Sequence, residues 1–343
     1  MFSALIDKLQ RREDLTMGEA SAAMGEIMDG NATPAQIAGL LIALAMKGER
    51  PAEIVGLAQT MRGRATRLSR SYSPVFDTCG TGGDRSHSFN VSTVAALVVA
   101  ACGVRVAKHG NRSVSSRCGS ADLLEAFGVQ VTAPPAVVER CLSEGGIAFF
   151  LAPTFHPSMR HAGATRKELG VRTAFNLLGP LTNPAGASRQ LIGVPRPELT
   201  ELVARSLGLL GSERAWVVHG ADGLDEISTT GYTKISECRG TTVNTFYLHP
   251  SDVRLRKAAA PDLIGGSAED NARIAREVLA GQPGPPRDIV LLNAGASLFI
   301  AGAAPTVFAG IGMAATAIDT GRAAGTLETL VRLSNQAPEA AAV

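Results

Sequence analysis

From Pro74 onward, short runs rich in β-branched residues alternate with helix-like segments. The runs are "VFDTC", "VRVAKHG", "IAFFLAP", "LIGV" and "AWVVHG", and helices are expected from Asn90, from Ser120, near His156 and from Pro197. Parallel strands joined by crossover helices produce such an alternation. The sequence therefore predicts an α/β fold with a mostly parallel central sheet.

Residues 1 to about 62 carry no strand pattern and read as helices throughout. They contain the usual signals for helix starts and stops, which are Thr16 with Glu19, Thr33-Pro34, Arg50-Pro51, Gly30 and Gly48. We predict a small all-helical domain over residues 1–70, to which about 165–185 could contribute, and a large α/β domain over 71–343. Within the latter, 232–248 read as a hairpin turning at Arg239-Gly240, and the chain ends in helices.

The composition limits the kinds of partner that the protein is expected to bind. The 33 basic residues nearly balance the 31 acidic ones, and only 4% of residues are aromatic, so the sequence lacks the basic footprint and stacking surface of a nucleic-acid-binding protein. No apolar stretch approaches the roughly 20 residues that cross a bilayer, and charges interrupt the N-terminal segment. The five cysteines are scattered without a C-x-x-C pair, which favours reduced thiols. We expect a cytoplasmic protein that binds neither nucleic acid nor membrane.

A glycine cluster, "DTCGTGGD" (77–84), lies between the first predicted strand and a helix whose N-cap candidate is Asn90. Free backbone N–H groups and a helix N-terminus at that place suit a phosphate. The cluster is not a Walker loop, because no Gly-Lys-Ser/Thr follows, and it departs from G-x-G-x-x-G at Arg85. Taken alone, a plain tight turn would also explain it.

A second polar segment, "KHGNRSVSS" (108–116), follows the next strand at the same predicted edge of the sheet. Lys108 and Arg112 supply cations, and the donors are Asn111, Ser113, Ser115 and Ser116. Ser120 precedes a helix, so it could donate to the same anion or simply cap that helix. Two consecutive strand ends with anion-binding chemistry favour a phosphate site.

A third element, "GLDEIS" (223–228), places Asp225 and Glu226 at another strand end. Adjacent acids on a loop are usually solvated, but beside two phosphate-type loops they favour Mg²⁺, which prefers oxygen ligands and keeps several waters. Asp84 could assist through water or cap its own turn.

Five segments in this order resemble the anthranilate phosphoribosyltransferase family: "DTCGTGGD", "FNVST", "VAKHGNRSVSS", "RKELGVRTAFNLLGPLTNP" and "HGADGLDEIS". The resemblance covers most of the chain. It implies an enzyme of tryptophan biosynthesis that transfers the phosphoribosyl group of phosphoribosyl pyrophosphate to anthranilate. It also implies a nucleoside phosphorylase-like two-domain fold and a homodimer packed through the small helical domains.

The resemblance also implies residue roles. Phosphoribosyl pyrophosphate is expected at Gly80, Gly83, Asp84, Ser88, Asn90, Val91, Ser92, Thr93, Lys108, His109, Gly110, Asn111, Arg112, Ser113, Val114, Ser115, Ser116 and Ser120. Anthranilate is expected at Gly80, His109, Asn111, Arg166 and Gly179, and Mg²⁺ at Ser92, Asp225 and Glu226. For His109 a packed loop histidine remains an alternative, and Arg166 in "ATRKELG" would ordinarily be solvated. No covalent nucleophile is expected.

The sequence departs from the family pattern at four positions. Arg85 stands where glycine is common, Ser88 where threonine is common, Cys118 where serine is common, and Cys79 where valine is frequent. Serine for threonine keeps the hydroxyl, and Cys79 is expected to face the core. Arg85 adds a cation beside the diphosphate, and either tighter binding or altered loop mobility would follow.

Two other functions remain open at this point. A pyrimidine nucleoside phosphorylase shares the layout and the glycine-rich loop, but free phosphate does not require the acid pair Asp225-Glu226. A non-catalytic relative that binds nucleic acid is disfavoured by the near-neutral charge.

Overall fold

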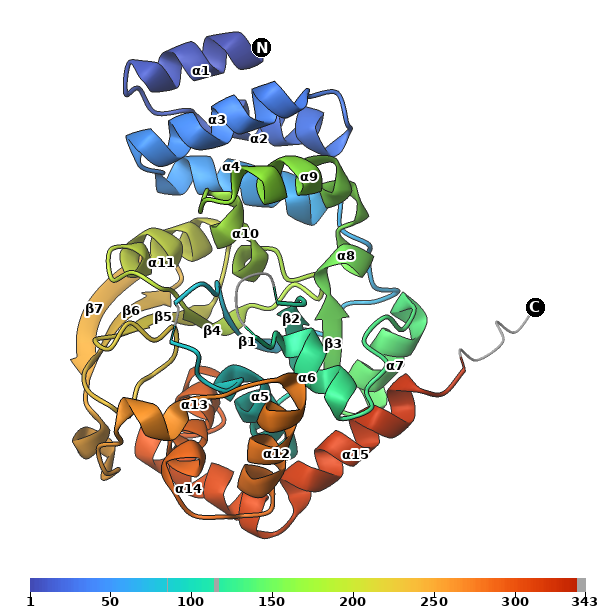
Figure 1. Cartoon of the computed structure of the whole chain (residues 1–343), viewed down its shortest axis with the longest axis vertical. Helices are drawn as coiled ribbons and strands as arrows, with labels where there is room; N and C mark the ends of the chain where they lie inside the picture. The colour runs from blue at the N-terminus through green and yellow to red at the C-terminus, as the bar shows by residue number, and fades with distance from the viewer. Residues whose placement is uncertain (85, 114–116, 338–343) are drawn as a thin grey trace.

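The computed structural model describes residues 1–84, 86–113 and 117–337. A helical part lies above a larger α/β part, and the chain passes between them more than once (Figure 1). The predicted fold class, a small N-terminal helical domain with a large α/β domain, is confirmed.

The N-terminal part is built from the helices α1 (Phe2–Gln10), α2 (Met17–Met28), α3 (Pro34–Lys47) and α4 (Pro51–Gly63). Thr16 and Thr33 each accept a hydrogen bond from the backbone three residues on, closing the capping boxes that start α2 and α3. Gly48, in a positive-φ conformation, ends α3. A later helix, α9 (Arg160–Leu169), packs against α2 and α3, so a distant segment joins this bundle (Figure 1).

Seven strands form one sheet in the order β3-β2-β1-β4-β5-β6-β7. They are β1 (Phe76–Gly80), β2 (Val106–Gly110), β3 (Ile147–Leu151), β4 (Arg189–Gly193), β5 (Arg214–Gly220), β6 (Thr233–Arg239) and β7 (Thr242–Leu248). The first five are parallel, and β6 and β7 form an antiparallel hairpin at one edge. After β3 the chain returns to pair β4 beside β1, so the strand order reverses between β1 and β4.

Helices cover both faces of the sheet, as a parallel sheet requires. The remaining helices are α5 (Val91–Ala101), α6 (Ser120–Ala126), α7 (Pro135–Glu144), α8 (Ala152–Phe155), α10 (Phe175–Leu181), α11 (Leu199–Leu209), α12 (Ala268–Leu279), α13 (Pro285–Ile300), α14 (Val307–Asp319) and α15 (Arg322–Ser334), with 3-10 turns at Pro157–Met159, Pro250–Val253 and Ala260–Leu263. On one face of the sheet, α5 packs on β1 to β3 and contacts α13 and α15. On the second face, α11 packs on β5 to β7. Helix α4 contacts α10 and α11, which joins the helical part to the second face.

Three local expectations differ in detail. Gly119, rather than Ser120, is the N-cap of α6, and Ser120 is the first helical residue. Arg239 pairs with Thr242, so the hairpin turns at residues 240–241, one position later than predicted. Asn90 is the N-cap of α5, but its side chain donates to the Cys118 carbonyl instead of capping the helix. Among the described residues, no helix is long and apolar enough to cross a membrane.

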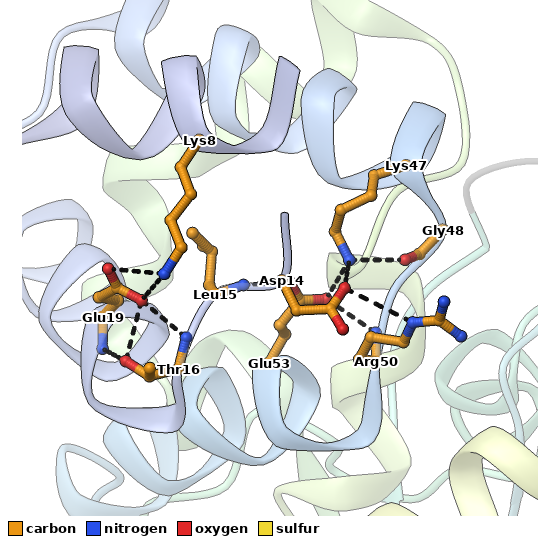
Figure 2. A network of polar contacts seen from close by, with 9 residues as sticks. All are labelled: Lys8, Asp14, Leu15, Thr16, Glu19, Lys47, Gly48, Arg50 and Glu53. Carbon is orange, nitrogen blue, oxygen red and sulfur yellow. Dashed lines mark hydrogen bonds and ion pairs between the residues drawn. The ribbon is translucent and has the colours of Figure 1, made fainter. Parts of the chain in front are cut away.

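A buried ionic network fixes the N-terminal helices (Figure 2). The side chain of Glu53 is fully buried and accepts from the amides of Leu15 (2.8 Å) and Arg50 (2.7 Å). Lys47 Nζ, also buried, lies 3.1 Å from Glu53 and 2.7 Å from Asp14. One carboxylate therefore joins the start of α4, the end of α3 and the segment before α2.

We predict that Glu53→Ala destabilises the protein by roughly 2–4 kcal/mol, because it leaves the amides of Leu15 and Arg50 without an acceptor and removes one of the two carboxylates that pair with Lys47. Urea unfolding followed by circular dichroism measures the change. The control is Asp29→Ala, which removes the more exposed ion pair to Arg64 and is expected to cost less than about 1 kcal/mol. Equal effects of the two variants would contradict the assigned importance of Glu53.

Candidate active site

The predicted site residues gather where the strand order reverses. The carboxyl ends of β1 and β4 lie side by side, with Gly80 paired to Gly193, and the Thr81 amide donates to the Gly193 carbonyl at 2.9 Å. In open α/β sheets, ligands bind outside the carboxyl ends of the strands at such a switch point. The glycine loop, residues 80–84, starts at this place.

The loop after β5 lies directly on these two strand ends. A Cβ atom on Gly80 would overlap the Asp225 carboxylate, and one on Gly193 would overlap the Asp225 backbone carbonyl. Only glycine at both positions allows so close an approach. The pair of glycines therefore places Asp225 and Glu226 against the glycine loop.

Three carboxylates are crowded at this edge. Asp225 accepts from the Gly82 amide (2.9 Å), Glu226 from the Ser92 amide at the start of α5 (3.0 Å), and Asp84 from the Asp225 amide (3.4 Å). Burial, with the charges of Asp84 and Glu226, raises the pKa of Asp225 well above its ordinary value. Burial likewise raises the pKa of Glu226 to about 7, although Lys108 opposes the shift. The arrangement favours a bound cation.

Lys108 is a buried cation whose charge acts on Glu226. Its Nζ atom donates to the Thr78 carbonyl (2.6 Å) and lies 3.4 Å from Ser92 Oγ. Asp77, on β1, is fully buried, and burial raises its pKa to about 6 against the effect of Lys108. Asn183 donates to both Asp77 (2.8 Å) and the Ala107 carbonyl (2.7 Å), which ties β1 to β2.

The acid pair fits a magnesium ion held jointly with a phosphate ligand. Within the described ranges, no group of three His, Cys, Asp or Glu side chains forms a complete metal cage. Mg²⁺ does not need one, since it is usually bound by one or two carboxylates together with water and substrate phosphates. The half-buried Asp225 and the buried Glu226, both with raised pKa values, supply that donor set, and the Ser92 amide donates to Glu226.

Of the residues predicted for the aromatic substrate, Arg166 lies on α9, Gly179 on α10 and His109 on β2. Gly80 is the last residue of β1, and Asn111 directly follows β2. The Arg166 guanidinium lies over the Phe175 ring, 5.4 Å from its centroid, and burial lowers the pKa of Arg166. This side chain is half-buried, whereas its helix alone suggests a solvated guanidinium. His109 donates from Nδ1 to the Gly179 carbonyl (3.0 Å), since a carbonyl can only accept. Burial, with a contribution from His156, lowers the pKa of His109 to about 3, so the ring is neutral at pH 7.

The loop after β2 continues the same edge. A Cβ atom on Gly110 would overlap Ser120 Oγ, which is close to the Asn111 carbonyl (3.3 Å). Arg112 pairs with Glu125 and lies 3.4 Å from Asp122, so its charge is shared with α6. The Ser113 amide donates to Asp122 at 3.0 Å.

The other predicted residues surround the start of α5. Ser88 forms an isolated bridge with Ile264, and Val91 and Thr93 are buried in the first turn of α5. Gly83 adopts a positive φ in the glycine loop, and Cys79 is buried as expected. Arg85, Val114, Ser115 and Ser116 lie outside the described residues, so the expectations for them remain predictions.

Sequence reasoning missed four residues that support the site, which are Asp77, Arg172, Asn183 and Asn271. Asn271 donates to Asn90 Oδ1 (2.9 Å) and accepts from the Gly266 amide (2.8 Å), which fixes the residue before α5. Asp77 is a charged residue inside the otherwise apolar run "VFDTC", and a charge in a buried strand indicates a residue that needs polar partners. The contact between Asn271 and Asn90 joins residues 181 positions apart, and no local pattern indicates it.

Fold and site together define a class of enzyme. The model of the glycosyl transferase family a/b domain matches residues 72–324, and that of the glycosyl transferase family helical bundle domain matches residues 3–65. The architecture is thus that of a two-domain glycosyl transferase.

Similar proteins identify the family within this class of glycosyl transferases. Anthranilate phosphoribosyltransferases of Moorella thermoacetica and Syntrophobacter fumaroxidans are each 55% identical over 331 residues, 96% of this chain and 98% of the relative. The chain belongs to the anthranilate phosphoribosyltransferase family and is an enzyme. The predicted resemblance is confirmed.

Solved structures agree with this assignment. The crystal structure of the enzyme from Thermus thermophilus superimposes with a TM-score of 0.91 at 45% identity, covering 97% of this chain and 99% of that one. The Saccharomyces cerevisiae enzyme in complex with PRPP and Mg gives a TM-score of 0.88 at 27% identity, covering 97% of each chain.

The raised pKa of Glu226 predicts a pH-dependent stability change. A folded-state pKa of about 7, above the ordinary 4.5, means that ionisation opposes folding as pH rises from 4.5 to 7. Glu226→Gln removes this penalty, so we expect the ligand-free variant to be up to roughly 3 kcal/mol more stable than wild type at pH 8 and little changed at pH 4. Thermal and urea unfolding at both pH values measure the difference.

Glu237→Gln is the matched control with the opposite sign. Burial alone would raise the pKa of Glu237, but hydrogen bonds from Trp216, Arg239 and Arg214 outweigh it and lower that pKa. Stability from Glu237 is therefore present above pH 4.5 and lost as pH falls, so this variant should be destabilised at pH 8. A Glu226→Gln protein less stable than wild type at pH 8 would contradict the crowding of the acid cluster.

Proposed function

We propose that the protein transfers the phosphoribosyl group of 5-phosphoribosyl 1-pyrophosphate to the amino group of anthranilate, giving N-(5-phosphoribosyl)anthranilate and pyrophosphate in tryptophan biosynthesis. The observation that carries this function is the acid pair of half-buried Asp225 and buried Glu226, hydrogen-bonded to the glycine loop and to the start of α5. The Saccharomyces cerevisiae relative complexed with PRPP and Mg supports the phosphoribosyl donor. The same enzyme in complex with 4-fluoroanthranilate, with a TM-score of 0.85 at 26% identity, supports the acceptor.

The donor is proposed to lie along the edge formed by the glycine loop, the start of α5 and the loop after β2. Backbone amides of the glycine loop and Lys108 would stabilise the charge that develops on the leaving pyrophosphate. We expect the hydroxyl groups of Ser88 and Ser120, with Asn90, to hold the ribose and phosphate oxygens. Residues 114–116, outside the described ranges, are proposed to complete this binding edge.

Anthranilate is proposed to bind between α9, α10 and the end of β2. Arg166 would pair with the carboxylate, and Asn111 would orient the amine toward the donor. His109 and Gly179 contact each other and would form one wall of the site. A neutral His109 adds no positive charge beside the electron-poor C1 carbon.

Mg²⁺ is proposed to bind at Ser92, Asp225 and Glu226. When bound, the ion neutralises charge on the diphosphate and assists its departure. The chain's own contribution is to keep these two carboxylates fixed against the glycine loop by the Gly82 and Ser92 amides.

The chemistry needs positioning more than acid-base activation. An arylamine is already neutral at pH 7, so its nitrogen can attack C1 directly. The bond from nitrogen to C1 forms, and the bond from C1 to the pyrophosphate oxygen breaks. The pyrophosphate takes the bonding electrons, and the nitrogen releases one proton to the solvent. Holding both substrates in line supplies much of the rate.

The test is the loss of anthranilate fluorescence when purified protein is mixed with phosphoribosyl pyrophosphate and Mg²⁺. We expect consumption of anthranilate that depends on both. Asp225→Asn should lower kcat/KM by roughly 100-fold or more and shift the magnesium dependence to higher concentration, because a charged ligand is lost. No fluorescence loss at micromolar enzyme would overturn the function.

Two parallel measurements separate the other functions considered from the sequence. Release of free base from thymidine or uridine with phosphate would indicate a nucleoside phosphorylase. Salt-dependent binding of an oligonucleotide without anthranilate consumption would indicate a nucleic-acid-binding relative.

We also propose a homodimer packed through the helical parts of two copies. Met17 on α2 and Met46 on α3 are exposed apolar side chains in this part, with 37% and 76% of their surface accessible. The boundary between the two parts is proposed to lie between residues 70 and 71. Helix α9 is added to the helical part because it packs on α2 and α3. Cytoplasmic location remains a prediction.

Sedimentation equilibrium tests the dimer. At micromolar concentration we expect about twice the chain mass of 35.5 kDa, and Met46→Glu should shift the equilibrium toward monomer by placing a charge in the contact. Phe308→Glu, at an exposed apolar side chain on α14 of the α/β part, is the control and should leave the equilibrium unchanged. A monomeric wild-type protein would contradict the proposal.

A further inference from the structure

Arg172 lies between the two sides of the proposed site. It belongs to the short segment that joins α9 to α10, six residues after Arg166. Its Nη1 atom donates to the Gly82 carbonyl at 2.6 Å, and its Nη2 atom lies 3.4 Å from Thr81 Oγ1. One guanidinium therefore reaches from the helical segment to two consecutive residues of the glycine loop.

The loop backbone is shaped around this guanidinium. Gly83 has a φ of +74°, and a Cβ atom there would overlap Arg172 Nη1. A side chain at position 83 would displace Arg172 as well as strain the loop. The contact is thus a close packing of a charged group on bare backbone.

The charges around Arg172 also favour its position at the glycine loop. Burial lowers the pKa of Arg172, while Asp225 and Asp84 oppose that change. A half-buried guanidinium beside two carboxylates, yet bonded to the loop carbonyl, contributes charge to the acid cluster and a hydrogen bond to the loop.

The segment that carries Arg172 is itself fixed to the aromatic side. Arg166 lies over the ring of Phe175, the first residue of α10, and the Thr173 amide donates to Asn176 Oδ1 (2.9 Å). A shift of this segment would move Arg166 and the Gly82 contact together.

We propose that Arg172 is a positioning residue that fastens the glycine loop to the segment holding Arg166. The position of the donor subsite would then depend on the position of the acceptor subsite. This inference rests on the proposed function for its kinetic consequences. Its structural part, the fastening of residues 80–84, does not depend on that function.

The kinetic test compares Arg172→Gln and Arg172→Lys with Arg160→Gln, a change at an exposed arginine on α9. Loss of a charge-assisted hydrogen bond should raise the KM for phosphoribosyl pyrophosphate by roughly 10- to 100-fold in Arg172→Gln. Lysine keeps the charge but not the fork, so Arg172→Lys should recover at least part of this loss. Arg160→Gln should remain within about twofold of wild type.

Coupling is tested by the double variant Arg172→Gln with Arg166→Gln. If Arg172 links the two subsites, the combined loss of kcat/KM should differ from the product of the single losses by about fivefold or more. Losses that multiply within about twofold would overturn the link. A fall in kcat with unchanged KM values and a lowered melting temperature would overturn it too, since that result indicates a purely structural role.

Amide hydrogen exchange gives a readout without activity. In ligand-free Arg172→Gln, amides of residues 80–84 should exchange about tenfold faster than in wild type, with α11 unchanged. Unchanged exchange overturns the inference even if wild type is active. Faster exchange in a protein that never consumes anthranilate supports the fastening while overturning the proposed function.

Discussion

The close approach of the Asp225 segment to the ends of β1 and β4 is the constraint on which the site depends. It requires glycine at both Gly80 and Gly193, because any Cβ atom there would overlap Asp225. It also requires these strands to be neighbours, which the reversal of strand order provides. With the segment in place, the Gly82 amide and the Ser92 amide donate to the two carboxylates, and the glycine loop and α5 acquire fixed positions.

This constraint makes it unfavourable for both carboxyl groups to be ionised in the protein alone. Asp225 is half-buried and Glu226 is buried, both near Asp84, and Lys108 opposes only part of the pKa shift of Glu226. Folding must be supported elsewhere, by the apolar cluster that continues from the N-terminal helices through α10 and α11 to the sheet, and by networks such as that of Glu53. Under the proposed function, a cation bound together with an anionic substrate would lower this cost, which would link binding to the raised pKa values.

Much of this architecture follows from local sequence. Strand-helix alternation predicts the sheet, and polar loops after successive parallel strands must meet at one edge, so Lys108 and Asp225 could be placed together in advance. Arg172 could not be, because its partner Gly82 is 90 residues away and a lone arginine in a polar segment is ordinarily solvated. Burial of Arg166 was missed for the same reason, since the Phe175 ring that covers it comes from the next helix. The substrate and metal roles of individual residues came from the family resemblance, because the hydrophobic periodicity of the sequence does not indicate them.

The most direct test of the central claim is the number of protons released when Mg²⁺ and phosphoribosyl pyrophosphate bind together, measured by titration calorimetry in buffers of different ionisation enthalpy. Because the pKa of Glu226 is about 7 in the free protein and falls beside a cation, we expect roughly half a proton or more to be released per site at pH 7. Glu226→Gln should release measurably less. Equal release by the two proteins, or none from wild type, would contradict a buried acid pair that is held ready for a cation.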